Sequence, residues 1–110
     1  MKIKHIKIPL YRDCITVVIC TKEEMLTLGK KWKIRSTILN DIDDCKAATL
    51  HPVGRDVTIW TQHLKCFSEL GHEVIHASMG ILRRAGVRVD EDNHEALTYL
   101  FTYICDQMKL

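Results

Sequence analysis

The strongest constraint on this chain is the segment 72–76, which reads H-E-V-I-H, an H-E-x-x-H pattern. It lies inside a stretch, 64–85, whose apolar spacing predicts a helix. Residues four apart on a helix share one face, so His72 and His76 can point both imidazoles at one ion. Glu73 lies about 100° further round and can reach a water on that ion without binding the ion itself. This combination is what catalytic zinc requires, so the pattern predicts a Zn²⁺ site with Glu73 as general base.

The apolar residues of this predicted helix lie on the side opposite the two histidines. By the helical pitch they form one broad stripe. Its members are Phe67, Leu70, Val74, Ser78, Ile81, Leu82 and Ala85. Such a helix can bury one side against a sheet and present the other to a cleft, and Gly86 marks its expected C-terminal end.

Three further patterns predict strands. Alternation over residues 6–10 indicates a half-buried strand, and the β-branched, apolar run 14–20 indicates a central strand covered on both sides. Residues 47–51 and 56–60 flank a Pro- and Gly-containing turn and predict a hairpin. If the second arm of the hairpin lies at the sheet edge beside the metal, its backbone could pair with an extended peptide.

The other segments give weaker signals. Thr21 and Glu24 form a capping box that predicts a helix from there to about Trp32. Residues 40–44 are acidic but lack the spacing and glycine of a calcium loop, so we expect a solvated loop.

A last helix is expected to run to about Met108, capped by Asp90, Asp92 or Asn93. Its first turn holds two possible third metal ligands, His94 and Glu95. Glu95 follows His76 by nineteen residues, and a helix-loop-helix turn can return it over the motif helix. Two histidines and a glutamate form a known catalytic zinc set. The spacing of Asp92 and Glu95 also fits a plain capping box, so the residues alone leave the third ligand open.

Composition narrows the class of protein. The 110 residues carry a formal net charge of +2 with no block of Lys or Arg, which argues against nucleic acid as a partner. No apolar run is long enough for a membrane anchor or signal peptide. The five cysteines are odd in number and include no C-x-x-C, so we expect a reduced, cytoplasmic protein folded as one domain over 1–110.

The motif and the segment 94–100, H-E-A-L-T-Y-L, together resemble the zincin metallopeptidases in their gluzincin form. The segment is similar to the one that follows the motif in small bacterial and phage-encoded zincin-like proteins, and in peptidases that cleave phage-type repressors. The resemblance covers residues 58–103. It implies an α+β fold with a small, mostly antiparallel sheet packed against the motif helix and the C-terminal helix.

By matching position the resemblance makes His72, His76 and Glu95 the zinc ligands and Glu73 the general base. The implied activity is hydrolysis of a protein or peptide substrate by a zinc-activated water. The alternative is a non-enzymatic zincin-like module that docks onto a partner protein and inhibits it. For the donor that would stabilise the oxyanion, the sequence leaves four candidates, which are Tyr99, Tyr103, His94 and Arg83.

Overall fold

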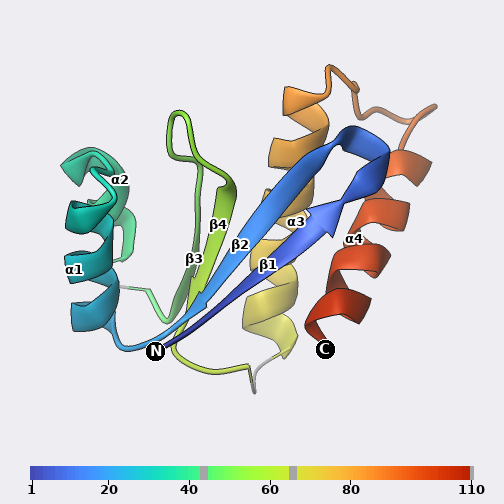
Figure 1. Cartoon of the computed structure of the whole chain (residues 1–110). Helices are drawn as coiled ribbons and strands as arrows, with labels where there is room; N and C mark the ends of the chain where they lie inside the picture. Colours follow the sequence, from blue (N-terminus) through green and yellow to red (C-terminus); the bar gives the residue numbers. More distant parts are fainter. Residues whose placement is uncertain (43–44, 65–66, 110) are drawn as a thin grey trace.

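The computed structural model describes residues 1–42, 45–64 and 67–109, and it is organised around a mixed β-sheet (Figure 1). The elements in chain order are β1 (Lys2–Ile8), η1 (Pro9–Tyr11), β2 (Asp13–Ile19), α1 (Lys22–Lys31), α2 (Ser36–Leu39), η2 (Asn40–Ile42), β3 (Ala47–Leu50), β4 (Val57–Thr61), α3 (Phe67–Arg84) and α4 (Glu95–Met108). The predicted α+β class is confirmed.

The strand order across the sheet is β1-β2-β4-β3. The outer strands β1 and β3 run antiparallel to their neighbours, whereas the two inner strands run parallel, with Ile15 opposite Val57. The predicted hairpin forms as β3 and β4, with Leu50 paired to Thr58. Its first arm, β3, lies at the sheet edge and its second arm lies inside the sheet, so the condition for peptide pairing along the second arm is not met.

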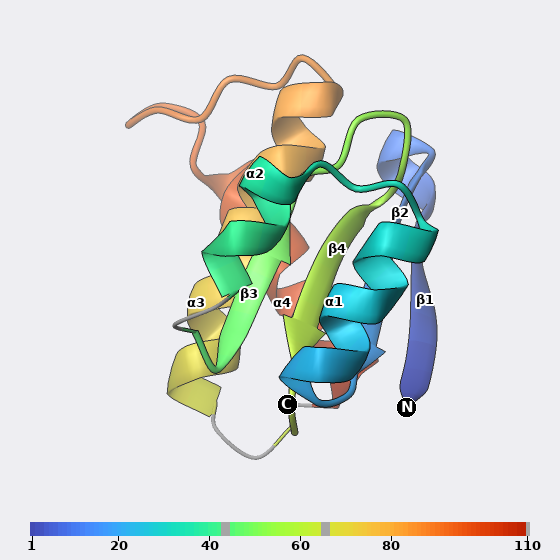
Figure 2. The same ribbon diagram turned by 90° about the vertical axis from the view of Figure 1, so that its left-hand side faces the viewer.

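Helices cover both faces of the sheet. Figure 1 shows α3 and α4 on one face, and Figure 2 shows α1 and α2 in front of the other. Ile15 and Val17 of β2 pack into the core beneath α3 and α4, while Val18 packs with α1 and Trp60 on the opposite side. Burial on both faces is the reason that β2 is apolar at nearly every position.

The first strand differs from the predicted one. It begins at Lys2 and ends at Ile8, and Leu10 lies in the short helix η1 with 69% of its surface exposed. Pro9 occupies the first position of η1. An N–H at this position would make no hydrogen bond within the helix, so the lack of one in proline costs nothing.

The acidic segment 40–44 was predicted to be a solvated loop, and the structure agrees only in part. Asn40–Ile42 form η2, and Ile42 is buried in the cluster around Trp60. Asp43 and Asp44 lie outside the described residues.

The predicted side-chain caps of the last helix were wrong. The helix begins at Glu95, and the preceding His94 makes no side-chain capping hydrogen bond. The Asp90 carboxylate instead accepts from the Asp92 amide, and the Asn93 side chain donates to the Arg88 carbonyl. These groups hold the loop between α3 and α4.

The middle of the motif helix α3 has the two-sided character that its sequence predicts, but the ends of the predicted stripe are not buried, since Phe67 is 57% exposed and Ala85 is also exposed. Val74 and Ile81 are fully buried, while His72 and His76 are exposed. Gly86 follows the helix with a φ of +74°, as expected for a C-terminal cap. Within the described residues, no helix combines the length and the apolar character that crossing a membrane would require.

The capping box at the start of α1 is present, and it gives a stability prediction. Thr21 Oγ1 accepts from the Glu24 amide, and the Glu24 carboxylate accepts from the Thr21 amide. We expect Thr21→Ala to lower the free energy of unfolding by about 1 kcal/mol in urea denaturation. Thr27→Ala, inside the same helix, is the control and should be neutral or slightly stabilising because alanine favours helix. Equal losses in the two variants would contradict the capping role.

Candidate metal centre

Two imidazole nitrogens converge on the exposed side of α3. His72 Nε2 and His76 Nε2 lie 3.1 Å apart, and the rings meet edge to face with centroids separated by 4.7 Å. Two nitrogens that each lie 2.0–2.1 Å from a tetrahedral zinc ion are about 3.3 Å apart. The spacing of the pair therefore suits one shared ion, and the exposure of both rings leaves room for solvent.

Glu73 completes this group from the inner side of the helix. Ligand atoms of His72, Glu73 and His76 all lie within 4.8 Å of one another. Glu73 is only 8% exposed, and its Oε1 accepts a hydrogen bond of 3.0 Å from the Thr49 hydroxyl. The same hydroxyl lies 2.9 Å from the Glu73 carbonyl oxygen, so Thr49 on strand β3 holds the side chain and backbone of Glu73 together.

Glu95 is not brought to the histidines. It is exposed at the first residue of α4, and Figure 1 shows that α4 starts at the end of the helical layer where α3 finishes. From His76, α3 continues to Arg84, which is about 12 Å along the helix axis. Among the described residues, Glu95 belongs to no group of ligand atoms within 4.8 Å. The structure thus assembles three of the four predicted site residues.

A groove runs beside His72 and Glu73, between α3 and the start of β3. Its volume is about 540 Å³, and it is lined by Cys45, Lys46, Ala47, Ser68, Glu69, His72 and Glu73. Two of these side chains, Cys45 and Glu69, are chemically able to bind zinc. The sequence motif gave no reason to consider either of them.

The four candidate oxyanion donors all lie away from the histidine pair. Tyr99 and Tyr103 line a separate hollow with η1, and the Tyr103 hydroxyl donates to the Lys7 carbonyl on β1. His94 Nδ1 lies 3.1 Å from the Glu91 carbonyl oxygen in the loop before α4. Arg83 lines a pocket at the C-terminal end of α3.

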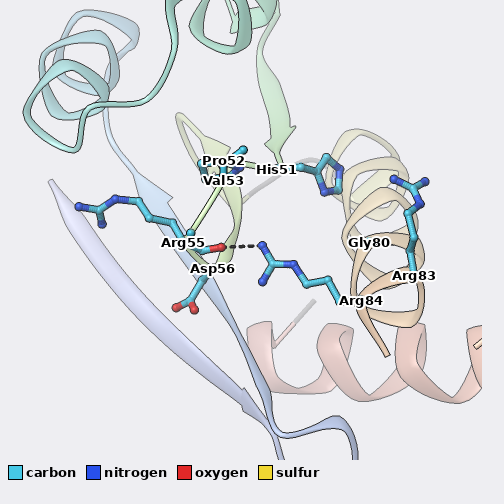
Figure 3. A pocket seen from close by; sticks show the side chains of 9 residues that line it. His51, Pro52, Val53, Arg55, Asp56, Gly80, Arg83 and Arg84 are labelled. Atoms are coloured by element: carbon cyan, nitrogen blue, oxygen red, sulfur yellow. Dashed lines mark hydrogen bonds between the residues drawn. The ribbon is translucent and has the colours of Figure 1, made fainter. Parts of the chain in front are cut away.

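His51 is a residue near the site that the sequence did not single out. It follows β3 directly, and its ring occupies the space over Gly80, one turn beyond His76 (Figure 3). A Cβ at position 80 would lie 2.6 Å from His51 Cε1, so only glycine admits the ring there. Burial, followed by the charges of Arg83 and Arg84, lowers the pKa of His51 below its ordinary value of 6.5. The ring is therefore neutral at pH 7.

A second group of possible metal ligands lies on the sheet, on β1, β2 and the residue before β4. His5, Cys14 and Asp56 come from neighbouring strands or their ends, and their ligand atoms also lie within 4.8 Å of one another. Thr16 links two of them, since its Oγ1 donates to Asp56 at 3.1 Å and lies 3.2 Å from His5 Nδ1. Burial and the Asp56 charge raise the pKa of the Cys14 thiol. The polar groups of this second cluster are thus part-buried and engaged with Thr16, whereas the two histidines on α3, which lie within hydrogen-bond distance of each other, are exposed to solvent.

No protein-family model, curated protein or solved structure matches this chain. The likeness to the gluzincins therefore rests on the motif and the segment 94–100.

Metal binding gives the first prediction from this site. We expect the protein to bind one Zn²⁺, with His72→Ala and His76→Ala each lowering the affinity by at least about 100-fold, measured by competition with a chromogenic chelator. Glu95→Ala should leave the affinity unchanged because its carboxylate lies outside the group. An equal loss in Glu95→Ala would show that α4 supplies a ligand after all.

The position of His51 gives the second prediction. In Gly80→Ala the new methyl group should displace the imidazole towards solvent, which relieves its burial and raises its pKa. NMR titration of the ring protons measures this change. Gly71→Ala is the control, since a Cβ there meets only ordinary contacts at 3.6 Å from Phe67. A His51 pKa that is the same in the wild type and in Gly80→Ala would contradict the close packing.

Proposed function

We propose that this protein is a zinc-dependent peptidase in which His72 and His76 hold the ion and Glu73 is the general base. The observation that carries the proposal is the convergence of two exposed Nε2 atoms, 3.1 Å apart, beside a carboxylate that a strand residue holds in place. A pair of surface histidines without a catalytic role would need neither the buried glutamate nor its hydrogen bond to Thr49.

Zinc, when bound, lowers the pKa of a coordinated water and polarises a carbonyl oxygen. The chain supplies the proton transfer. Glu73 lines the groove, so its carboxylate can accept a proton from a water there and return it to the leaving amine. Thr49 donates to Oε1, which restricts the orientation of the carboxyl group.

The sheet edge next to the groove suits a peptide substrate. Strand β3 is the last in the sheet order, and α3 packs beside it. An extended peptide can add to a free strand edge through main-chain hydrogen bonds, which places its carbonyl groups at a regular spacing beside the histidines. Strand β3, and not the second arm of the hairpin, is therefore the strand whose backbone would pair with the peptide.

The candidates for the third protein ligand of the proposed centre are two groove residues. Like Glu95, neither belongs to the group of ligand atoms within 4.8 Å among the described residues, so either would have to move towards the histidines when zinc binds. Cys45 and Glu69 share the groove with His72, and zinc accepts either thiolate or carboxylate. Zinc-edge X-ray absorption distinguishes them, since a thiolate gives a Zn–S distance near 2.3 Å.

One observation favours a second function. Glu95 lies outside the ligand group, so the gluzincin set is incomplete as the chain is folded. This arrangement suits a non-enzymatic module that keeps the helix and sheet of a hydrolase but binds a partner protein. Such a module would retain its partner binding in His72→Ala and would contain no stoichiometric zinc after purification.

The two functions are separated by Glu73→Gln. This change keeps the shape and a hydrogen-bond acceptor for Thr49, so zinc content should be retained. Peptide hydrolysis should fall by 10²-fold or more with loss of the base. The assay is cleavage of a mixed peptide library followed by mass spectrometry, with zinc measured in the same samples.

Thr49 supplies a graded control for this experiment. Thr49→Val removes the hydroxyl that holds Glu73 and should lower kcat about tenfold, while Thr49→Ser keeps the hydroxyl and should retain most activity. Hydrolysis by zinc-loaded wild type that survives in Glu73→Gln would rule out Glu73 as the base. A zinc-loaded wild-type protein that cleaves no peptide would favour the docking module.

A further inference from the structure

A second pocket continues the line of the groove towards the C-terminal end of α3. Its volume is about 530 Å³. Figure 3 shows the loop between β3 and β4 facing α3 across it. The lining residues are His51, Pro52, Val53, Gly54, Arg55, Asp56, Gly80, Arg83 and Arg84.

The groove, the histidine pair and this pocket form one row because β3 and α3 advance together. Ala47 lines the groove with His72, Thr49 contacts Glu73, and His51 lies over Gly80. The order of these contacts shows that β3 and α3 run in the same direction. A peptide extended along the edge of β3 would pass the histidines and then reach the second pocket.

Among the described residues that line the pocket, Arg83 is the cation available for a ligand. Arg84 is occupied, since it donates to the Arg55 carbonyl and forms an ion pair of 3.4 Å with Asp13. The Arg55 guanidinium stacks on Trp32 at 4.8 Å and bonds to its carbonyl. Arg83 has no hydrogen bond or ion pair with any described residue.

The other groups of the pocket suit an anion beside Arg83. The His51 ring lies over Gly80 in the lining of the pocket, where a ring N–H can donate to an anion. Asp56 is the acidic group among the described lining residues, and its Oδ2 is already engaged by the Thr16 hydroxyl on β2. In Figure 3 the Asp56 carboxylate points away from His51 and Arg83.

We infer that this pocket is a specificity subsite that binds an acidic side chain of the peptide substrate through Arg83 and His51. The inference rests on the proposed peptidase function for the position of the substrate. Gly80 lies about 9 Å along the helix from the midpoint of the histidine pair, and an extended peptide advances about 3.3 Å per residue. The acidic residue is therefore expected about three residues from the scissile bond.

The binding arm of the test does not depend on catalysis. We would titrate ¹⁵N-labelled protein with acetyl-Gly-Glu-Gly-amide and, separately, with acetyl-Gly-Gln-Gly-amide. The glutamate peptide should shift the amide signals of Gly54 and Gly80, and the glutamine peptide should bind about tenfold more weakly. The difference should shrink as salt is raised.

Matched arginine variants show whether Arg83 is responsible. Arg83→Gln should abolish the preference for glutamate. Arg88→Gln removes the same charge from the exposed loop after α3, outside the pocket, and should preserve the preference. Equal binding of the two peptides by wild type, or an unchanged preference in Arg83→Gln, would overturn the inference.

The cleavage arm separates this inference from the proposed function. In the peptide library, wild type should favour Asp or Glu about three residues from the cleaved bond, and Arg83→Gln should lose that preference while still cleaving. Selective binding of the glutamate peptide without any cleavage would refute the peptidase and leave the acidic subsite standing. Cleavage without an acidic preference would refute the subsite alone.

Discussion

The contact between Thr49 on β3 and Glu73 on α3 is the interaction on which the candidate site depends. One hydroxyl lies within hydrogen-bond distance of both the backbone carbonyl and the carboxylate of Glu73. Together with the burial of Val74 and Ala77 against the sheet, it sets the rotation of α3 about its axis. With that rotation set, His72 and His76 can only face outward, along the rim beside the sheet edge.

The parallel course of β3 and α3 explains why separate chemical groups fall into one row. A strand advances about 3.3 Å per residue and a helix about 1.5 Å. From Thr49 to His51 the chain advances about 6.6 Å, and from Glu73 to Gly80 the helix advances about 10.5 Å, so the two segments run in the same direction, with Thr49 beside Glu73 and His51 over Gly80 further on. A substrate lying along the edge would meet these groups in sequence.

The helical hairpin of α3 and α4 accounts for the displaced Glu95. Glu95 follows His76 by nineteen residues. The chain can cover that spacing with a long helix and a short loop, or with a short helix and a long loop. Here α3 extends two turns beyond His76, and the loop then delivers Glu95 to the far end of the layer. The apolar residues that close the core, including Ile81 and Leu82, are the reason that α3 does not end sooner.

The sequence alone determined those helices, strands and caps that depend on residues close together in the chain. The period of the apolar residues predicted α3 and its exposed histidines, the unbroken β-branched run predicted the central strand β2, and the box of Thr21 and Glu24 predicted the start of α1. These features depend on residues within a few positions of one another, so their spacing carries the information. The α+β class followed only with the help of the resemblance.

The tertiary structure decided everything that joins distant segments. It placed β3 rather than β4 at the edge, Thr49 against Glu73, His51 over Gly80, and Glu95 away from the metal ligands. None of these contacts has a periodic signature, because each depends on strand order and on how far a helix runs before the chain turns. Spacing along the chain limits which residues can meet, but the packing of the sheet and helices selects those that do.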